Sequence, residues 1–97
     1  GQMKFDSVGG KFYKTNFEGA DLNIASFLFG DLREANLKNT NMYRADLGQA
    51  DLTGADLTNA DLTDANVEGA IFTNVKGLST VKGFSTVKGK CRDCGMP

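Results

Sequence analysis

The stretch ADLTGADLTNADLTDAN, residues 50–66, repeats every five residues, with Leu at the third place and Ala at the first. On an α-helix, a step of five residues turns the side chain by about 500°, so these leucines would form no stripe. In one long strand they would alternate between the two faces. The period therefore predicts short extended pieces, with Ala and Leu inward and Asp outward, separated by two-residue corners.

The same register runs through thirteen pentads when the large apolar residue is taken as the centre of each. Two places before every centre stands Gly, Ala or Thr, and the place between holds Asp or Asn in ten pentads. The predicted core consists of the thirteen centres: Phe12, Phe17, Leu22, Phe27, Leu32, Leu37, Met42, Leu47, Leu52, Leu57, Leu62, Val67 and Phe72.

Residues 10–74 resemble the pentapeptide repeat family, whose motif is A(D/N)LXX. The resemblance implies an all-β fold: a right-handed quadrilateral parallel β-helix, with four pentads to a turn and about three turns here. The outward residues also favour four pentads over three. Twenty residues per turn leave Asp31 and Asp51 as the like-charged neighbours, whereas fifteen would stack Asp31, Asp46 and Asp61 in one repulsive column.

The two ends of the coil are expected to carry caps, because an open parallel coil presents unpaired backbone groups. We assign residues 1–9, with Met3, Phe5 and Val8, to an N-terminal cap and residues 75–97 to a C-terminal cap with a Cys-containing tail. Residues 10–74 form the repeat region between them.

The C-terminal segment changes its period. VKGLSTVKGFSTVKG, residues 75–89, repeats every six residues and places its large apolar residues three apart. That spacing suits a 3₁₀ or loosely helical cap, while three glycines weaken any helix and leave an irregular or short-strand cap open. The lysines of the repeat would guard the exposed edge against pairing with another chain. These lysines are Lys76, Lys82 and Lys88.

The net charge of −1 is unevenly placed, since residues 15–74 carry ten acids and three bases. An acidic solenoid brings to mind the family members that are implicated in mimicking DNA at a topoisomerase. The thirteen pentads would form a rod of only about 16 Å, under half a helical turn of DNA, so a DNA-mimic topoisomerase inhibitor remains only as the least favoured alternative function. Basic residues are too few for direct nucleic-acid binding.

The motif CRDC places Cys91 and Cys94 three residues apart near the C-terminus. Such a pair can be a local disulfide, inert thiols, a bridge to another chain, or a redox or metal site. The chain has no His and no other Cys, so it cannot complete a zinc site alone, and no metal is predicted. A disulfide would indicate an oxidising compartment.

Catalytic constellations are absent from the sequence. Without His there is no Ser-His or Cys-His pair, and the carboxylates of a convex wall lack a pocket that would shift their pKa values. We therefore predict no enzyme activity and no cofactor.

Apolar residues occupy corners that elsewhere hold polar residues or Gly. Ile24, Leu28 and Phe29 are outward corner residues, and Tyr43 lies one turn beyond Asn23 on the neighbouring wall. They form a candidate binding patch for a partner or a second copy of the chain. The alternative is that the N-terminal segment or a loop folds over them.

The sequence thus predicts a non-catalytic protein-binding or scaffold module, with another protein as its partner and self-association left open. A redox-linked regulator acting through Cys91 and Cys94 is the alternative. No apolar run spans a bilayer, so we expect a soluble protein without a membrane partner. Its compartment is unassigned, with the thylakoid lumen or periplasm as a lead, because several family members reside in the lumen.

Overall fold

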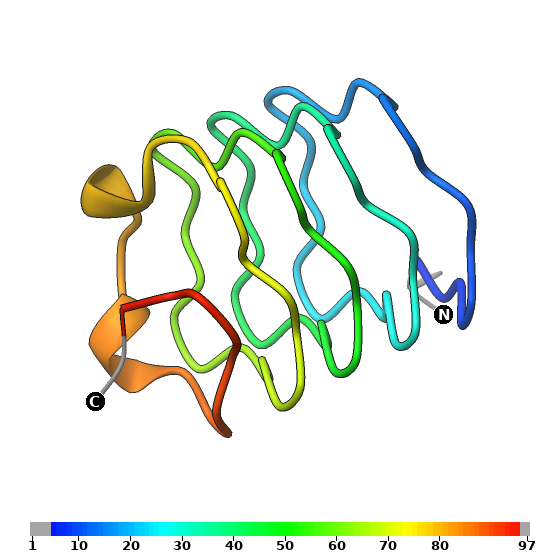
Figure 1. Ribbon diagram of the computed structural model, residues 1–97. Coiled ribbons are helices and arrows are strands. Elements are labelled where there is room, and N and C mark those ends of the chain that lie inside the picture. The colour runs from blue at the N-terminus through cyan, green and yellow to red at the C-terminus, as the bar shows by residue number, and fades with distance from the viewer. Residues whose placement is uncertain (1–4, 96–97) are drawn as a thin grey trace.

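The computed structural model describes residues 5–95, which form a coil whose turns stack along one axis (Figure 1). Met3, which we assigned to the N-terminal cap, lies outside the described residues. Eleven parallel bridges join an outward residue to the one twenty positions later, from Asp6 with Ser26 to Asp56 with Lys76. Each turn therefore takes four pentads, and the coil has four walls. The first and the last described residues lie at opposite ends of the stack.

Each extended piece contributes one bridge, and its backbone bonds reach the turns on either side. The N–H of Phe27 donates to Asp46 O at 2.7 Å, and the N–H of Asp46 donates to Ala25 O at 2.8 Å. At most corners, the first residue of the next pentad closes a β-turn through its N–H, as Ala25 N–H does on Leu22 O at 3.0 Å. The backbone polar groups of the walls are thereby paired between turns.

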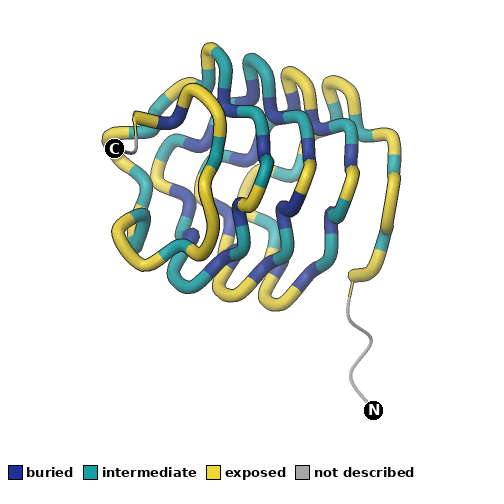
Figure 2. Tube along the Cα trace, turned by 60° about the horizontal axis from the view of Figure 1, so that its bottom comes forward, coloured by how far each residue is buried: buried dark blue, intermediate teal, exposed yellow. Residues whose placement is uncertain are grey.

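The core is a narrow column of large and small apolar side chains. Figure 2 shows that buried positions recur from turn to turn of the coil. Eleven of the thirteen predicted centres are buried, while Phe12 and Phe17 are half-buried in the first turn. Their rings form an aromatic cluster with Phe27, and Phe5 lies against it with its ring centroid 5.0 Å from that of Phe27. Phe5 therefore covers the N-terminal end of the core.

The ladder of bridges crosses both boundaries that we drew for the repeat region. At the N-terminal side it begins with Asp6, inside the predicted cap. At the C-terminal side Lys82, Lys88 and Arg92 pair with residues 21 or 22 positions earlier. The described segment 75–95 thus continues the coil, with one residue added at each of two corners and one residue fewer between Lys88 and Arg92.

Two short 3₁₀ helices, η1 (Leu78–Thr80) and η2 (Phe84–Thr86), hold the added residues. Gly77 and Gly83 precede them with φ of 75° and 71°, a left-handed conformation that Gly adopts without a steric cost. The glycines replace the pentad centre, so the following Leu78 and Phe84 pack against the end of the core. The expected 3₁₀ turns and the continued ladder therefore occur together.

In a further pentad, a backbone carbonyl would accept the hydrogen bond from the corner N–H of the preceding turn. In the six-residue repeat, a threonine hydroxyl accepts that hydrogen bond instead. Thr80 Oγ1 accepts a hydrogen bond from Asn59 N–H at 2.8 Å, and Thr86 Oγ1 accepts one from Asp64 N–H at 2.8 Å. Both hydroxyls in turn donate to a glycine carbonyl at 2.6 Å. These bonds satisfy corner N–H groups at the last turn.

Candidate binding surface

The corners of the coil require a backbone conformation that most residues adopt only at an energetic cost. Their second residue has a positive φ, and in most corners it is Gly, Asn, Asp or a long polar residue. Ile24 and Phe29 are the apolar residues in this conformation, both with φ of 60°. A left-handed conformation is costly for bulky and β-branched side chains. The two apolar corners are therefore held in place at a cost in backbone energy.

The structure places the four predicted patch residues at the two corners that flank one wall. Ile24 N–H donates to Tyr43 O at 2.9 Å, which stacks these two residues in successive turns of one corner. Leu28 and Phe29 form the next corner, where Phe29 N–H donates to Gly48 O at 2.9 Å. We call Ile24, Leu28, Phe29 and Tyr43 the corner patch.

The corner patch is accessible in the described part of the chain. Phe29 is 61% exposed, and Ile24 and Tyr43 are each 38% exposed. Leu28 is half-buried and lies against Gly48, where an added Cβ would come within 2.9 Å of Leu28 Cδ1. Residues 5–9 continue the ladder, with Gly9 N–H bonded to Leu28 O, and they leave Phe29 exposed.

Val8 extends the apolar surface and was not among the predicted patch residues. It is 61% exposed and lies one turn before Leu28. Val8 falls within the predicted N-terminal cap, although its position twenty residues before Leu28 is a sequence signal for the corner patch.

The outward carboxylates are tied into their own walls by a recurring Asp-x-Thr pattern. Thr53, Thr58 and Thr63 each donate their hydroxyl to the Asp two places earlier at 2.6 Å, and their backbone N–H groups donate to the same oxygen. Sequence analysis missed this pairing, although Asp and Thr recur two places apart.

Hydrogen bonding lowers the pKa of several of these carboxyl groups. The hydroxyl and the backbone N–H of Thr63 hold the pKa of Asp61 below its ordinary value. For Asp56, burial opposes ionisation, but the hydrogen bonds from Thr58 together with the charges of Lys38 and Lys76 outweigh it, and the pKa is again lowered. The pKa of Asp31 is lowered chiefly by its hydrogen bond with Arg33. These groups are ionised at neutral pH and have no sign of acid–base tuning.

Arg33 also relieves the like-charged neighbours Asp31 and Asp51. Its Nε lies 2.8 Å from Asp31 Oδ1, and its guanidinium lies 5.0 Å from the ring centroid of Tyr13. A cation at this corner therefore offsets the repulsion expected between the two stacked carboxylates.

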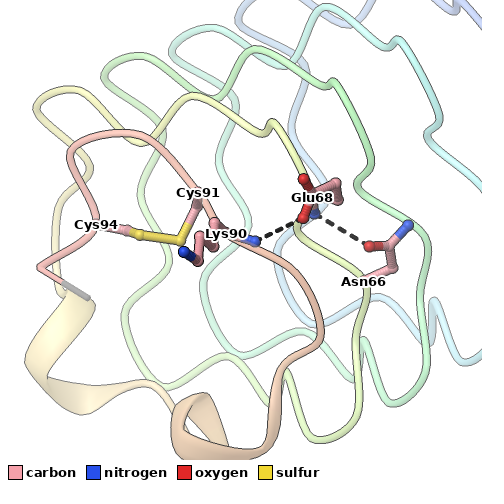
Figure 3. Close-up of a disulfide and its surroundings, with 5 residues drawn as sticks. All are labelled: Asn66, Glu68, Lys90, Cys91 and Cys94. Atoms are coloured by element: carbon pink, nitrogen blue, oxygen red, sulfur yellow. Dashed lines mark hydrogen bonds between the residues drawn. A yellow bond between two sulfur atoms is a disulfide. The ribbon is translucent and has the colours of Figure 1, made fainter. Parts of the chain in front are cut away.

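Cys91 and Cys94 form a disulfide at the last bridge of the ladder (Figure 3). Between them, Arg92 N–H donates to Ala70 O and Arg92 O accepts from Phe72 N–H, both at 2.8 Å. Cys94 is buried, with 4% exposure. The backbone of Lys90 is held alongside by Glu68 Oε2 at 2.8 Å. The disulfide therefore closes the final piece of the coil.

Reducing this disulfide is expected to lower the free energy of unfolding by about 2 kcal/mol, because it closes a loop of only a few residues. The loss should appear as a lower denaturation midpoint with reductant, and as faster amide exchange at Arg92 while Asp46 stays protected. The double variant Cys91→Ser, Cys94→Ser should match the reduced protein. Two thiols that react rapidly in the folded, unreduced protein would contradict this arrangement and favour redox chemistry.

Within residues 5–95, no group of three or more His, Cys, Asp or Glu side chains could hold a metal ion. The same part of the chain has no helix that is long and apolar enough to cross a membrane. The surface grooves that are open to solvent include one lined by Asn39, Thr40, Asn41, Asn59, Asp61 and Lys82. Another is lined by Arg33, Glu34, Thr53, Gly54, Asn74 and Lys76.

The fold and its surface define a β-solenoid built from five-residue units around an apolar column. A sequence model described as pentapeptide repeats matches residues 9–39 and 40–76, with eight copies. The chain belongs to the pentapeptide repeat family. A search of curated proteins found no match.

Two solved structures of the family are similar to this chain. HetL, a pentapeptide repeat protein involved in heterocyst differentiation regulation from the cyanobacterium Nostoc sp. strain PCC 7120, has a TM-score of 0.62 at 23% identity, over 90% of this chain and 46% of HetL. A pentapeptide repeat protein from the Arabidopsis thaliana thylakoid lumen has a TM-score of 0.58 at 30% identity, over 73% of this chain and 57% of that one. The chain thus spans about half the length of these two proteins.

Proposed function

We propose that this protein is a non-catalytic binding or scaffold module, whose rigid right-handed coil presents the corner patch to another protein. The family supports a binding role, since its members are built as repeat solenoids with extended walls. HetL takes part in the regulation of differentiation. Residues 75–97 act in this proposal as the C-terminal cap of the coil.

The observation that carries the proposal is the strained conformation of Ile24 and Phe29. Both are apolar, exposed and left-handed, at corner positions where Gly or Asn would be more stable. An exposed side chain gains little from the fold in return for that cost. Strain of this kind is typical of functional sites, so a contact with another molecule is its most direct explanation.

Replacing Ile24 by asparagine is therefore expected to stabilise the fold by about 1 kcal/mol while it weakens binding. Asparagine tolerates the left-handed region, and it already occupies the equivalent corner place at Asn39, Asn59 and Asn74. Chemical denaturation measures the first effect. Pull-down from an extract of the source organism, with the variant and the wild type in parallel, measures the second.

Phe29→Asn should behave in the same way, and Gln49→Asn is the matched control. Gln49 occupies the same place one turn later, also with a positive φ of 56°, but it is polar. Sedimentation at several concentrations shows whether the partner is a second copy. If both patch variants lose stability and keep every captured partner, the patch serves the fold and the proposal is wrong.

We further propose an oxidising compartment, such as the thylakoid lumen or the periplasm. Its support is the Cys91–Cys94 disulfide and the lumenal origin of the Arabidopsis relative.

A further inference from the structure

The wall between the two corners of the patch carries carboxylates. Its outward residues pair in the order Asp6, Ser26, Asp46, Asn66 and Lys88, and we call it the Ser26 wall. Ser26 lies two residues after Ile24 and two before Leu28, so the outer surface of this wall separates the two apolar corners, and we call that surface the floor of the site. At about 3.3 Å per residue, this floor is about 10 Å wide.

Within residues 5–95, the Ser26 wall differs from the other walls because neither of its carboxylates has a base paired with it or next to it in the ladder. Elsewhere each wall has a carboxylate with a neighbouring base: Asp31 with Arg33, Asp56 with Lys76, and Asp61 with Lys82. Among residues 5–95, no ion pair includes Asp6 or Asp46, and Arg44 at the preceding corner makes none with Asp46. Lys88 is two turns from Asp46 along the wall.

Asp46 is held in place by one of its two oxygens. Its Oδ1 accepts from Gly48 N–H at 2.9 Å and from Asn66 Nδ2 at 2.9 Å. Within the described chain, no hydrogen bond uses Oδ2. A fixed carboxylate with one oxygen to spare is a good acceptor for an incoming ammonium or guanidinium group.

We propose that the corner patch and the Ser26 wall together bind an extended protein segment that places a Lys or Arg between two apolar side chains. This inference rests on the proposed function and names the chemistry of its partner. The apolar groups pack on Ile24 and Phe29, while the cation lies over Asp46. Charge complementarity favours this occupant over a second copy presenting the same acidic wall, where like charges would face each other.

Three labelled peptides test the proposal, each with two leucines four residues apart and Lys, Gln or Glu midway between them. In an extended peptide this spacing puts the three side chains on one face. NMR titration should show the Lys peptide binding wild-type protein about threefold to fivefold more tightly than the Gln peptide, and the Glu peptide binding more weakly still. Added salt should reduce the first difference.

Asp46→Asn is the decisive variant, because asparagine keeps the bonds made through Oδ1 and already occupies this place in neighbouring pentads. It should remove the preference for the Lys peptide and leave the Gln peptide unaffected. Asp51→Asn, with the same change of charge on another wall, should leave the preference intact. Equal effects of the two variants, or no binding by any peptide, would overturn the proposal.

Phe29→Ser separates this proposal from the one on which it rests. Loss of binding by both the Lys and Gln peptides in this variant, with equal effects of Asp46→Asn and Asp51→Asn, would keep the patch as a binding site but reject a cationic occupant. Undiminished binding by Phe29→Ser would reject the patch itself.

Discussion

Leu52→Ala is expected to lower the free energy of unfolding by about 3 to 5 kcal/mol, close to the total stability of many small domains. Leu52 is fully buried in the middle of the stack. Its turn is held on both sides by the ladder, through Leu52 N–H to Ile71 O at 2.8 Å and Asp51 N–H to Gly30 O at 2.9 Å. The walls cannot collapse into the space that the side chain leaves, so the cavity persists.

Leu28→Ala is the matched control for this prediction, because it removes the same atoms from a half-buried corner. We expect a loss below about 1 kcal/mol there. Urea denaturation followed by far-UV circular dichroism measures both variants. Similar losses at the two positions would mean that the centre of each pentad does not form the core of the coil.

Gly83→Ala is expected to cost about 2 to 4 kcal/mol, because two penalties coincide. Gly83 has φ of 71°, and a Cβ at this position would lie 2.7 Å from Thr63 Cα. That atom belongs to the backbone of the preceding turn and cannot rotate away. The substitution must therefore push η2 off the end of the core.

Gly19→Ala isolates the first of these penalties. Gly19 has a similar φ of 74°, but nothing lies within 4 Å of the added Cβ. Its expected cost is about 1 kcal/mol. Thermal unfolding of the two variants should differ clearly. Equal midpoints would show that the close approach of Gly83 to Thr63 does not limit the cap.

The repeat region was predictable because each pentad repeats one local rule. The alternation of small and large inward residues set the register. A turn of fifteen residues would have stacked the charges of Asp31, Asp46 and Asp61, so the sequence favoured a turn of twenty residues. The bridges confirm the turn of twenty residues. The corner residues Ile24 and Phe29 were noticed as departures from the pattern. Their positive φ could not be deduced, because it depends on the turn that closes each corner.

The end of the coil was harder to predict for a physical reason. Three-residue spacing of Val75, Leu78 and Val81 indicated 3₁₀ structure, but it concealed the ladder that Lys76 and Lys82 continue. One inserted residue changes which side chain points inward. A pattern with period six is therefore compatible with a continued coil and also with a separate cap. The bonds of Thr80 to the preceding turn depend on that stacking and had no local signal.

The turn of twenty residues gives the molecule a fixed unit of length. Successive turns lie about 4.8 Å apart, and each touches only its neighbours. Duplicating the segment 41–60 would therefore move the corner patch one such step away from the Cys91–Cys94 disulfide, with both kept intact. Insertion or deletion of whole turns would in this way change the distance between the corner patch and the disulfide end of the coil in steps of one turn.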